Sequence, residues 1–294
     1  MIYDIRQTTA CTYASPVAHA HHVLRLTPVN QPGQRVQVSS LRIEPEPVRW
    51  REGQDFFGNR LTWIAIEDAH DVLTVKVSAR IAVEPFALPP ADSAPAWEAA
   101  QEEVFASDEI GPTAPAHFLF PSRMVSLDPE IRDYARQSFA PGRSILEAAT
   151  DLTRRIKTDM AYDIGATTVT TTPPMSFALR RGVCQDFAHI MISGLRGIGL
   201  PAAYVSGYLR TTRAPGATQL QGADAMHAWV LVWCGAAIGW IGFDPTNDMI
   251  ASDEHIVLAI GRDYTDVAPM DGVIVASGGQ HIDVSVNVLP VPAA

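Results

Sequence analysis

The spacing of the hydrophobic residues changes partway along the chain, and this change limits the possible folds more than any other feature. In the first 85 residues, apolar side chains alternate with polar ones or form short β-branched runs, as β-strands require. From about residue 116 they recur at steps of three and four, as in amphipathic helices. We therefore expect an α+β protein whose all-β part comes first.

Several strands are expected in the N-terminal part, separated by turn sequences rich in glycine and proline such as NQPGQ and FGN. Strands at this spacing, without a long helix between them, are typical of a β-sandwich or a related all-β module. The strands that the pattern indicates lie at 23–28, 35–45, 60–68 and 71–85.

The composition changes again at residues 86–115, which are rich in proline, alanine and acidic residues. We expect this stretch to be a connector with one short helix. It would join a β-rich N-terminal domain, residues 1–85, to a second domain, residues 116–294. A chain of 294 residues favours two domains, and the last strands of the second domain can return to the first.

Within the second domain, helices are expected at 127–140 and 144–160. A loop should then run from Tyr162 to Cys184, because glycine and a Pro-Pro pair interrupt the helical pattern. Another helix should begin at Cys184 and end at the sequence GIGLP. The strands that follow are expected at 202–212, 227–234, 239–246, 272–279 and 281–291.

The charge and the cysteine content limit the partners and the compartment. A formal net charge of −10 disfavours general binding to nucleic acid or to an anionic membrane. No apolar run is long enough for a membrane span, and the first residues do not resemble a signal peptide. Three cysteines are a small and odd number, which disfavours a disulfide framework. We expect a cytoplasmic protein with no nucleic-acid or membrane partner, and its oligomeric state stays open.

Cys184 stands just after a glycine and at the start of an expected helix, in the stretch RRGVCQDFAH. The unpaired N–H groups and the dipole at a helix start stabilise a thiolate, so this position suits a nucleophile. A single cysteine is nevertheless more often an inert and buried side chain. Cys184 alone leaves both interpretations open.

Two further residues supply the partners that a cysteine nucleophile needs. His227 opens the apolar strand HAWVLVW, and Asp244 ends the next apolar strand, WIGFD. A nucleophile, a base and a group that orients the base are the arrangement of covalent catalysis. A histidine on a sheet and an aspartate before proline are each common alone. The three residues in this order favour catalysis.

A metal site is a weaker alternative. Cys184, His189, His227 and Cys234 lack the close Cys-x-x-Cys or His-x-x-x-His pair that zinc-binding sequences carry. The sequence also has no acidic loop of the EF-hand type that binds calcium. We therefore expect neither a metal ion nor another cofactor.

The segments RGVCQDFAH, HAWVLVW and IGFDPTND resemble the three core motifs of bacterial transglutaminase-like proteins, which belong to the papain-like cysteine superfamily. The resemblance covers about residues 140–265. DFFGNRLTW and EHIVLAIGRDYTDVAP are similar to segments of the two-domain bacterial group. The resemblance implies a β-sandwich-like N-terminal domain and a papain-like core, in which the nucleophile helix packs on an antiparallel sheet.

By position, the resemblance implies that Cys184 is the nucleophile, that His227 is the base and that Asp244 orients the imidazole. The backbone N–H of Cys184 would donate to the oxyanion. Some family members add an upstream aromatic side chain there, and Tyr162 is the nearest candidate in this chain.

Other residues are weaker candidates for the cleft. Gln185 and His189 belong to the CQDFAH motif, although His189 is expected rather to bond to a neighbouring backbone group. Tyr204 and Tyr208 can line a substrate groove or, as we expect, pack between strands.

Such a site forms a thioester with a peptide, a protein or another amide substrate, and the second nucleophile decides the activity. If water attacks, the enzyme is an amidase or a peptidase. If a primary amine attacks, it is a protein-glutamine γ-glutamyltransferase that crosslinks proteins. We expect hydrolysis first and transamidation second. A non-catalytic binding or scaffolding module of the same fold is a third possibility, which the presence of all three residues disfavours.

Overall fold

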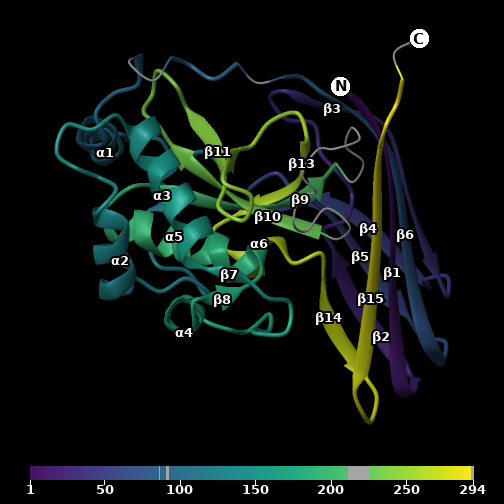
Figure 1. Cartoon of the computed structure of the whole chain (residues 1–294). Coiled ribbons are helices and arrows are strands. Elements are labelled where there is room, and N and C mark those ends of the chain that lie inside the picture. Colours follow the sequence, from purple (N-terminus) through teal and green to yellow (C-terminus); the bar gives the residue numbers. More distant parts are fainter. Residues whose placement is uncertain (86, 91–92, 211–225, 293–294) are drawn as a thin grey trace.

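The computed structural model describes residues 1–85, 87–90, 93–210 and 226–292, and it has two parts that lie side by side (Figure 1). One part is a sandwich of long strands, and the other combines helices with a shorter sheet. Within the described ranges, no helix has the length and apolar character that crossing a membrane requires.

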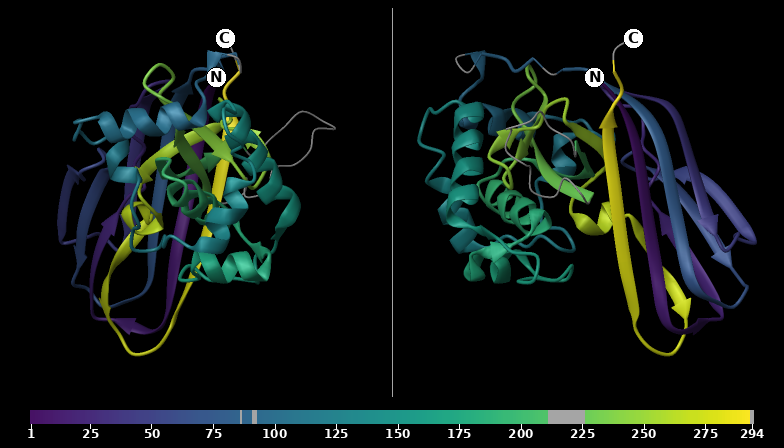
Figure 2. Two further views of the ribbon diagram at one scale, coloured as in Figure 1. Left: turned by 90° about the vertical axis from the view of Figure 1, so that its left-hand side faces the viewer. Right: turned by 45° about the vertical axis from the view of Figure 1, so that its right-hand side comes forward.

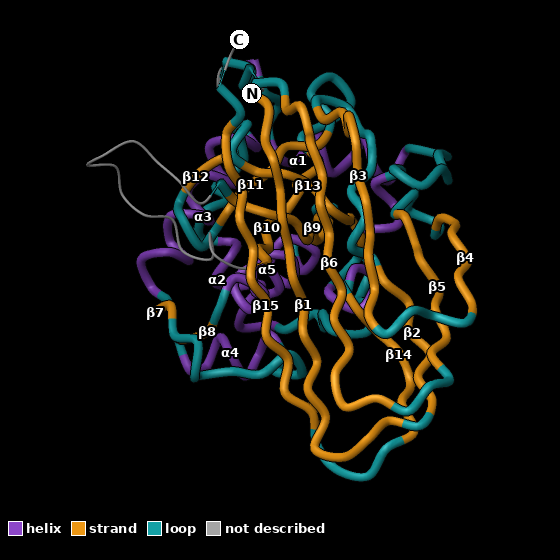
Figure 3. The backbone as a smooth tube through the Cα atoms, turned by 90° about the vertical axis from the view of Figure 1, so that its right-hand side faces the viewer, coloured by secondary structure: helices purple, strands orange, loops and turns teal. Residues whose placement is uncertain are grey.

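The sandwich consists of two four-stranded antiparallel sheets, in the orders β15-β1-β6-β3 and β14-β2-β5-β4 (Figure 3). Alternate side chains of β6 are buried, so one face of the strand contributes to the core between the sheets. The expected β-sandwich-like N-terminal part is confirmed. Its strands are β1 (Ile2–Val17), β2 (His19–Leu24), β3 (Gln34–Glu44), β4 (Arg49–Gln54), β5 (Arg60–Ile66), β6 (His70–Val83), β14 (Met270–Val275) and β15 (Gln280–Pro290).

Two strands of the sandwich, β1 and β4, are absent from the strands that the sequence pattern indicates. Every second side chain of β1 is buried from Tyr3 to Tyr13, but the buried positions include the polar residues Gln7 and Thr9. This breaks the apolar alternation that identifies a strand. The side chains of β4 are almost all exposed, so β4 has no apolar face to detect.

The last two strands of the chain complete the sandwich. β15 pairs antiparallel with β1, from Pro290 opposite Tyr3 to Gln280 opposite Tyr13. β14 pairs in the same way with β2 (Figure 2). The sandwich is therefore built from both ends of the chain, and the helical part is inserted between them.

The second part contains a five-stranded antiparallel sheet in the order β12-β11-β10-β9-β13. Thr211 and Thr212, expected at the end of one of these strands, lie outside the described residues. The strands are β9 (Ala202–Leu209), β10 (Met226–Trp233), β11 (Trp240–Asp244), β12 (Met249–Ile250) and β13 (His255–Gly261). The helices are α1 (Trp97–Ala106), the 3₁₀ helix η2 (Pro115–Phe118), α2 (Pro129–Arg136), α3 (Ile145–Asp159), α4 (Pro173–Leu179), α5 (Cys184–Gly197) and α6 (Tyr264–Val267).

Helix α5 is the centre of this second part. Its side chains form one buried cluster with Ala228, Val230 and Val232 of β10, so the helix packs on the sheet. The expected α+β core, with a helix that begins at Cys184 on an antiparallel sheet, is confirmed.

The sequence predicts one loop between Tyr162 and Cys184, and this prediction is wrong. The stretch holds the helix α4, which begins at Pro173, and the second strand of a short parallel pair, β7 (Ala161–Tyr162) with β8 (Arg181–Gly182). Proline is favoured in the first turn of a helix, because its missing N–H would have no intrahelical partner there. The Pro-Pro pair therefore starts a helix instead of interrupting one.

Two amide side chains of the sandwich dock onto β13, the edge strand of the core sheet. Gln34 both donates to the carbonyl of Val257 and accepts from its N–H, each at 2.8 Å. Asn59 makes the same two bonds with Ile260, also at 2.8 Å. Each amide satisfies backbone groups that an edge strand would leave unpaired, so the two parts are held in one arrangement.

Candidate active site

Cys184 is the first residue of α5, and a hydrogen-bonded aspartate fixes the geometry of that helix start. Asp186 accepts from the backbone N–H of Val183 at 2.8 Å and from the hydroxyl of Thr167 at 2.6 Å. Gly182 leaves room for this contact, since a Cβ there would lie 2.5 Å from the Asp186 carboxylate. Cys184 therefore stands at the end of α5 where the first N–H groups have no intrahelical partner.

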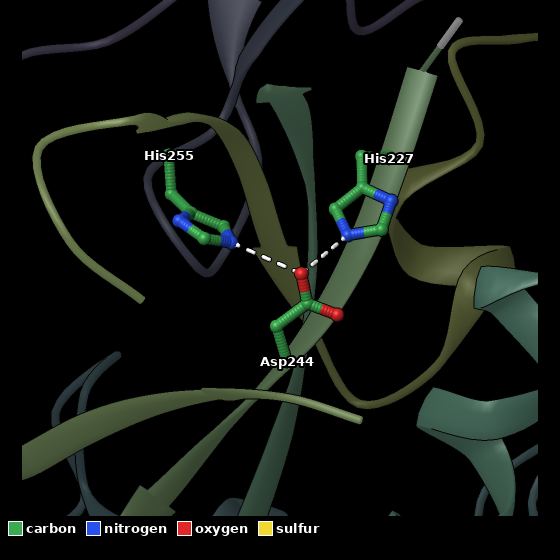
Figure 4. Close-up of side chains that lie close together, drawn as sticks. All are labelled: His227, Asp244 and His255. Atoms are coloured by element: carbon green, nitrogen blue, oxygen red, sulfur yellow. Dashed lines mark hydrogen bonds and ion pairs between the residues drawn. The ribbon is translucent and has the colours of Figure 1, made fainter. Parts of the chain in front are cut away.

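His227 and Asp244 are brought together by two neighbouring strands. His227 is the second residue of β10, and Asp244 is the last residue of β11. The Nε2 of His227 donates to Oδ2 of Asp244 at 2.9 Å, and both side chains are buried (Figure 4). The other ring nitrogen, Nδ1, has no hydrogen bond of normal length among the described residues. It is the nitrogen left for Cys184, whose thiol interacts with the imidazole.

The charges of this pair follow from its contacts. Burial alone would lower the pKa of His227, but the charge and hydrogen bond of Asp244, together with Cys184, raise it above its ordinary value. Burial alone would raise the pKa of Asp244, but the two histidines that bond to it hold that pKa well below its usual range. The imidazole is therefore readily protonated and the carboxylate stays ionised, as a thiolate–imidazolium pair requires.

Asp244 accepts hydrogen bonds at both carboxylate oxygens. Its Oδ1 accepts from the backbone N–H groups of Thr246 at 2.9 Å and of Asn247 at 3.2 Å. Its Oδ2 accepts from the side-chain amide of Asn247 at 2.8 Å. The same Oδ2 accepts from His227 and, at 3.2 Å, from Nε2 of His255. These bonds hold the carboxylate in one orientation and favour its charged form.

His255 is a site residue that the sequence analysis does not identify. It is the first residue of β13, and it is buried like His227. Its sequence setting offers a signal, because HIVLAIG and HAWVLVW both place a histidine directly before an apolar strand. The pairing of β13 and β10 with the shared neighbour β9 brings both strands to Asp244.

The ligand atoms of His227, Asp244 and His255 lie within 4.8 Å of one another, which is the one such group among the described residues. Nδ1 of His255 accepts from the backbone N–H of Ser252 at 3.3 Å, so in the neutral ring Nε2 carries the proton. Both imidazoles thus turn N–H groups toward the carboxylate, where a metal ion would need lone pairs. A hydrogen-bonded cluster fits these residues better than a metal centre.

Tyr162 lies beside the start of α5, in the short β7–β8 pair, and is not among the described residues that line the cavity next to Cys184. It lies opposite Gly182 in that pair, and its ring packs edge-on against Phe187 of α5, with the centroids 6.4 Å apart. Burial, with a further contribution from Cys184, raises the pKa of Tyr162 to about 12. Its hydroxyl therefore stays protonated at neutral pH and can donate a hydrogen bond.

The two remaining candidates from the CQDFAH motif differ in their surroundings. Gln185 lines the cavity next to Cys184, and its side-chain amide donates to the carbonyl of Val169 at 3.0 Å. His189 accepts from the backbone N–H of Tyr264 at 3.2 Å and packs against Tyr204. Burial lowers the pKa of His189 to about 4, so the ring is neutral. His189 thus satisfies a backbone group and lies outside the described lining of the cavity.

The cavity beside Cys184 has a volume of about 330 Å³ and lies between the core and the sandwich. The polar residues Gln7 and Thr9 of β1 line it, which explains why they interrupt the apolar pattern of that strand. Gln7 also accepts from the hydroxyl of Tyr208 at 2.6 Å, whereas Tyr204 lines the cavity itself. Leu26, which follows β2, Met270 of β14, and Ile282 and Val284 of β15 add apolar side chains to the lining.

The comparison with family models matches two regions of the chain. Residues 3–82 match the bacterial transglutaminase-like N-terminal region, and residues 132–245 match the transglutaminase-like superfamily. These regions correspond to the sandwich strands β1–β6 and to the segment that carries Cys184, His227 and Asp244.

Relatives cover nearly the whole chain. An uncharacterized protein of Mycobacterium tuberculosis is 37% identical over 298 residues, which cover 98% of this chain and 92% of the relative. An uncharacterized protein of Mycobacterium leprae is 32% identical, and the alignment covers 96% of each of the two chains. A crystal structure from Cytophaga hutchinsonii, described as a proposed cysteine protease, has a TM-score of 0.76 at 22% identity. The superposition covers 100% of this chain and 92% of the chain in that structure, so the two proteins share the fold.

Proposed function

The chain belongs to the transglutaminase-like superfamily, and from its site we propose that it is a cysteine-dependent enzyme that transfers acyl groups from peptide or other amide bonds. One observation carries the proposal. The buried imidazole of His227 donates to Asp244 through Nε2 and leaves Nδ1 for Cys184 at the start of α5. This is the relation of nucleophile, base and orienting group that covalent catalysis requires.

In the first half of the reaction, the thiolate of Cys184 attacks the carbonyl carbon of the substrate. The oxyanion that forms accepts from the backbone N–H of Cys184, with the Tyr162 hydroxyl as a second donor. The C–N bond then breaks, the amine leaves with a proton from His227, and a thioester remains on the enzyme.

In the second half, a new nucleophile attacks the thioester. We propose that water does so, with His227 taking one proton, so that the acid leaves and the thiol is restored. Among the described residues, no carboxylate lines the cavity. A primary amine that arrives as an ammonium ion would find no opposite charge there, which favours water.

Transamidation is the alternative, and the lining supplies an observation in its favour. Leu26, Ile282 and Val284 present apolar surface close to Cys184. Apolar walls exclude water from a reactive thioester and so give an amine more time to attack.

The same lining indicates the substrate. None of the described lining residues is an aspartate, glutamate, lysine or arginine. Because an unpaired charge is costly to bring into an apolar site, we propose that the acyl side of the substrate is an uncharged peptide segment.

The three cysteines are all free and buried, which agrees with the proposed cytoplasmic location.

A thiol-labelling experiment separates a catalytic protein from a non-catalytic module. Iodoacetamide should alkylate Cys184 near neutral pH faster than it alkylates a free thiol. Cys11 and Cys234 are internal controls, since burial raises the pKa of the Cys11 thiol to about 11 and that of Cys234 still further. Equally slow labelling of all three cysteines, mapped by mass spectrometry, would exclude the proposed activity.

A second experiment separates water from an amine as the second nucleophile. Glutamine-containing peptides are incubated with the protein, with and without a primary amine, and their masses are followed. Hydrolysis predicts cleavage or deamidation in both samples, with little amine incorporated. A dominant amine adduct would establish transamidation instead. Either product should disappear in Cys184→Ala.

A further inference from the structure

We infer that His255 is a positioning residue of this site: as a neutral ring with its proton on Nε2, it holds the Asp244 carboxylate in the orientation that His227 needs. The inference rests on the proposed function, because it assigns His255 a task in the same acyl transfer. No step of that proposal uses His255, and it does not touch the cavity beside Cys184.

The proton of His255 is placed by its two neighbours. The backbone N–H of Ser252 points at Nδ1 from 3.3 Å, so Nδ1 must present a lone pair. Nε2 then carries the proton and donates it to Oδ2 of Asp244 at 3.2 Å. A ring protonated at both nitrogens would lose the bond from Ser252 and set two N–H groups against each other.

The surroundings of His255 hold the ring in place and keep it neutral. Its side chain is 2% exposed, and Trp229 packs against it edge-on with the ring centroids 5.0 Å apart. Burial lowers the pKa of His255, and the nearby His227 lowers it further, whereas Asp244 and Glu254 raise it. The net effect is a lowered pKa, so His255 is uncharged at neutral pH.

Other charged groups lie around this pair. Arg210 forms an ion pair with Glu254 at 3.6 Å. Lys157 of α3 is attracted to Asp244. Glu84, which follows β6, lines a second cavity that His255 also borders. Since none of them donates to Oδ2 in the described contacts, His255, Asn247 and His227 are the donors there.

The two histidines on Oδ2 therefore differ in their tasks. His227 gains and loses a proton at Nδ1 during the reaction, while its Nε2–H remains hydrogen-bonded to Asp244. His255 stays neutral and keeps that carboxylate from rotating when the charge on His227 changes. A fixed carboxylate holds the imidazole at a constant angle to Cys184, which is the requirement for efficient proton transfer.

Nuclear magnetic resonance of the protein labelled with ¹⁵N in histidine tests the placement of the proton. Long-range ¹H–¹⁵N correlations should show His255 as the Nε2–H form at neutral pH, without titration near the usual histidine pKa. The signal is assigned by its loss in His255→Gln. An Nδ1–H form, or an ordinary titration near the usual histidine pKa, would overturn the inference.

Two substitutions then test the task. The side chain in His255→Gln can still donate to Asp244 and accept from Ser252, whereas His255→Phe fills the space without a donor. We expect His255→Phe to alkylate at Cys184 about 10-fold more slowly at neutral pH, a loss of the size that removal of such outer partners causes. His255→Gln should recover most of the rate. His70→Gln, which changes a buried histidine of the sandwich, should match the wild type.

The outcomes distinguish this inference from the proposed function. Slow alkylation of Cys184 in the wild type would remove the proposed function and this inference with it. Fast alkylation in the wild type, with equal rates in His255→Phe and His255→Gln, would leave the proposed function and overturn the role of His255. If His255→Phe does not fold, the resonance experiment still decides, because an Nδ1–H form of His255 would overturn the inference.

Discussion

The cavity has two walls, and their side chains are held in different ways. On the core wall, His227 has a fixed hydrogen-bond partner, Asp244, behind the cavity surface. On the sandwich wall, Ile282 and Val284 of β15 are 44% and 40% exposed. In the proposed function, His227 must keep one angle on the core wall, whereas Ile282 and Val284 on the sandwich wall would only contact the substrate. We infer that chemistry and substrate preference can be changed separately.

The largest expected effect comes from Asp244→Asn on the core wall. Both carboxylate oxygens accept from N–H groups, so an amide NH₂ would meet donors in either orientation. We expect kcat to fall by about ten-thousandfold, as when a triad aspartate is replaced by its amide. Steady-state kinetics at a temperature where the variant is folded measure this change. A variant with the wild-type kcat would mean that Asp244 does not orient His227.

The next effect is expected for Tyr162→Phe, which removes one hydroxyl next to the start of α5. If that hydroxyl donates to the oxyanion, kcat should fall by about a hundredfold with KM little changed, because the contact forms only in the transition state. Tyr134→Phe is a matched control, since its hydroxyl donates to Asp159 at 2.9 Å on another side of the core. Equal kcat values for the two variants would assign the oxyanion to backbone donors alone.

The pH dependence sharpens the difference between the walls. The pKa of His227 is raised by Asp244, so the imidazolium persists above the ordinary histidine value and is lost only when the pH rises through the raised pKa. The alkaline limb of kcat/KM should therefore lie well above about pH 6.5. Asp244→Asn should move this limb to lower pH, and substitutions on the sandwich wall should leave it in place. A wild-type limb near pH 6.5 would contradict the ion pair.

Local sequence is enough to predict some of this arrangement. Cys184, His227 and Asp244 each stand at the start or end of an element whose apolar pattern is visible, so the chain order of nucleophile, base and carboxylate can be inferred. The sandwich is likewise predictable where its strands alternate. It is missed at β1 and β4, where polar or exposed positions hide the pattern, and the strand expected at 23–28 lies instead at His19–Leu24 in β2.

Contacts between distant segments cannot be predicted in this way. His255 reaches Asp244 only because β13 and β10 both pair with β9, and a strand-forming pattern does not specify its neighbour. The sequence allows the last strands to return to the N-terminal part, but it does not specify that β15 pairs with β1. The cavity depends on the pairing of β15 with β1, since Ile282 and Val284 of β15 line it, so its sandwich wall could not be derived from the motifs alone. The assignment of catalytic roles to the three predicted residues stays a prediction until the substitutions are made.

The smallest expected effect is on the sandwich wall. Ile282→Ser removes apolar surface from the cavity without changing any group that bonds to the core. Losing apolar contact with the substrate should raise KM by about 10-fold and leave kcat and its pH limb unchanged. Burial of a side chain of this size by the bound substrate contributes about 1.5 kcal/mol or more. Leu289→Ser on the same strand is the control, because Leu289 is similarly exposed, at 48%, but does not line the cavity. A fall in kcat for Ile282→Ser alone would show that the sandwich wall also positions the reacting groups, and the two walls would then not be separable.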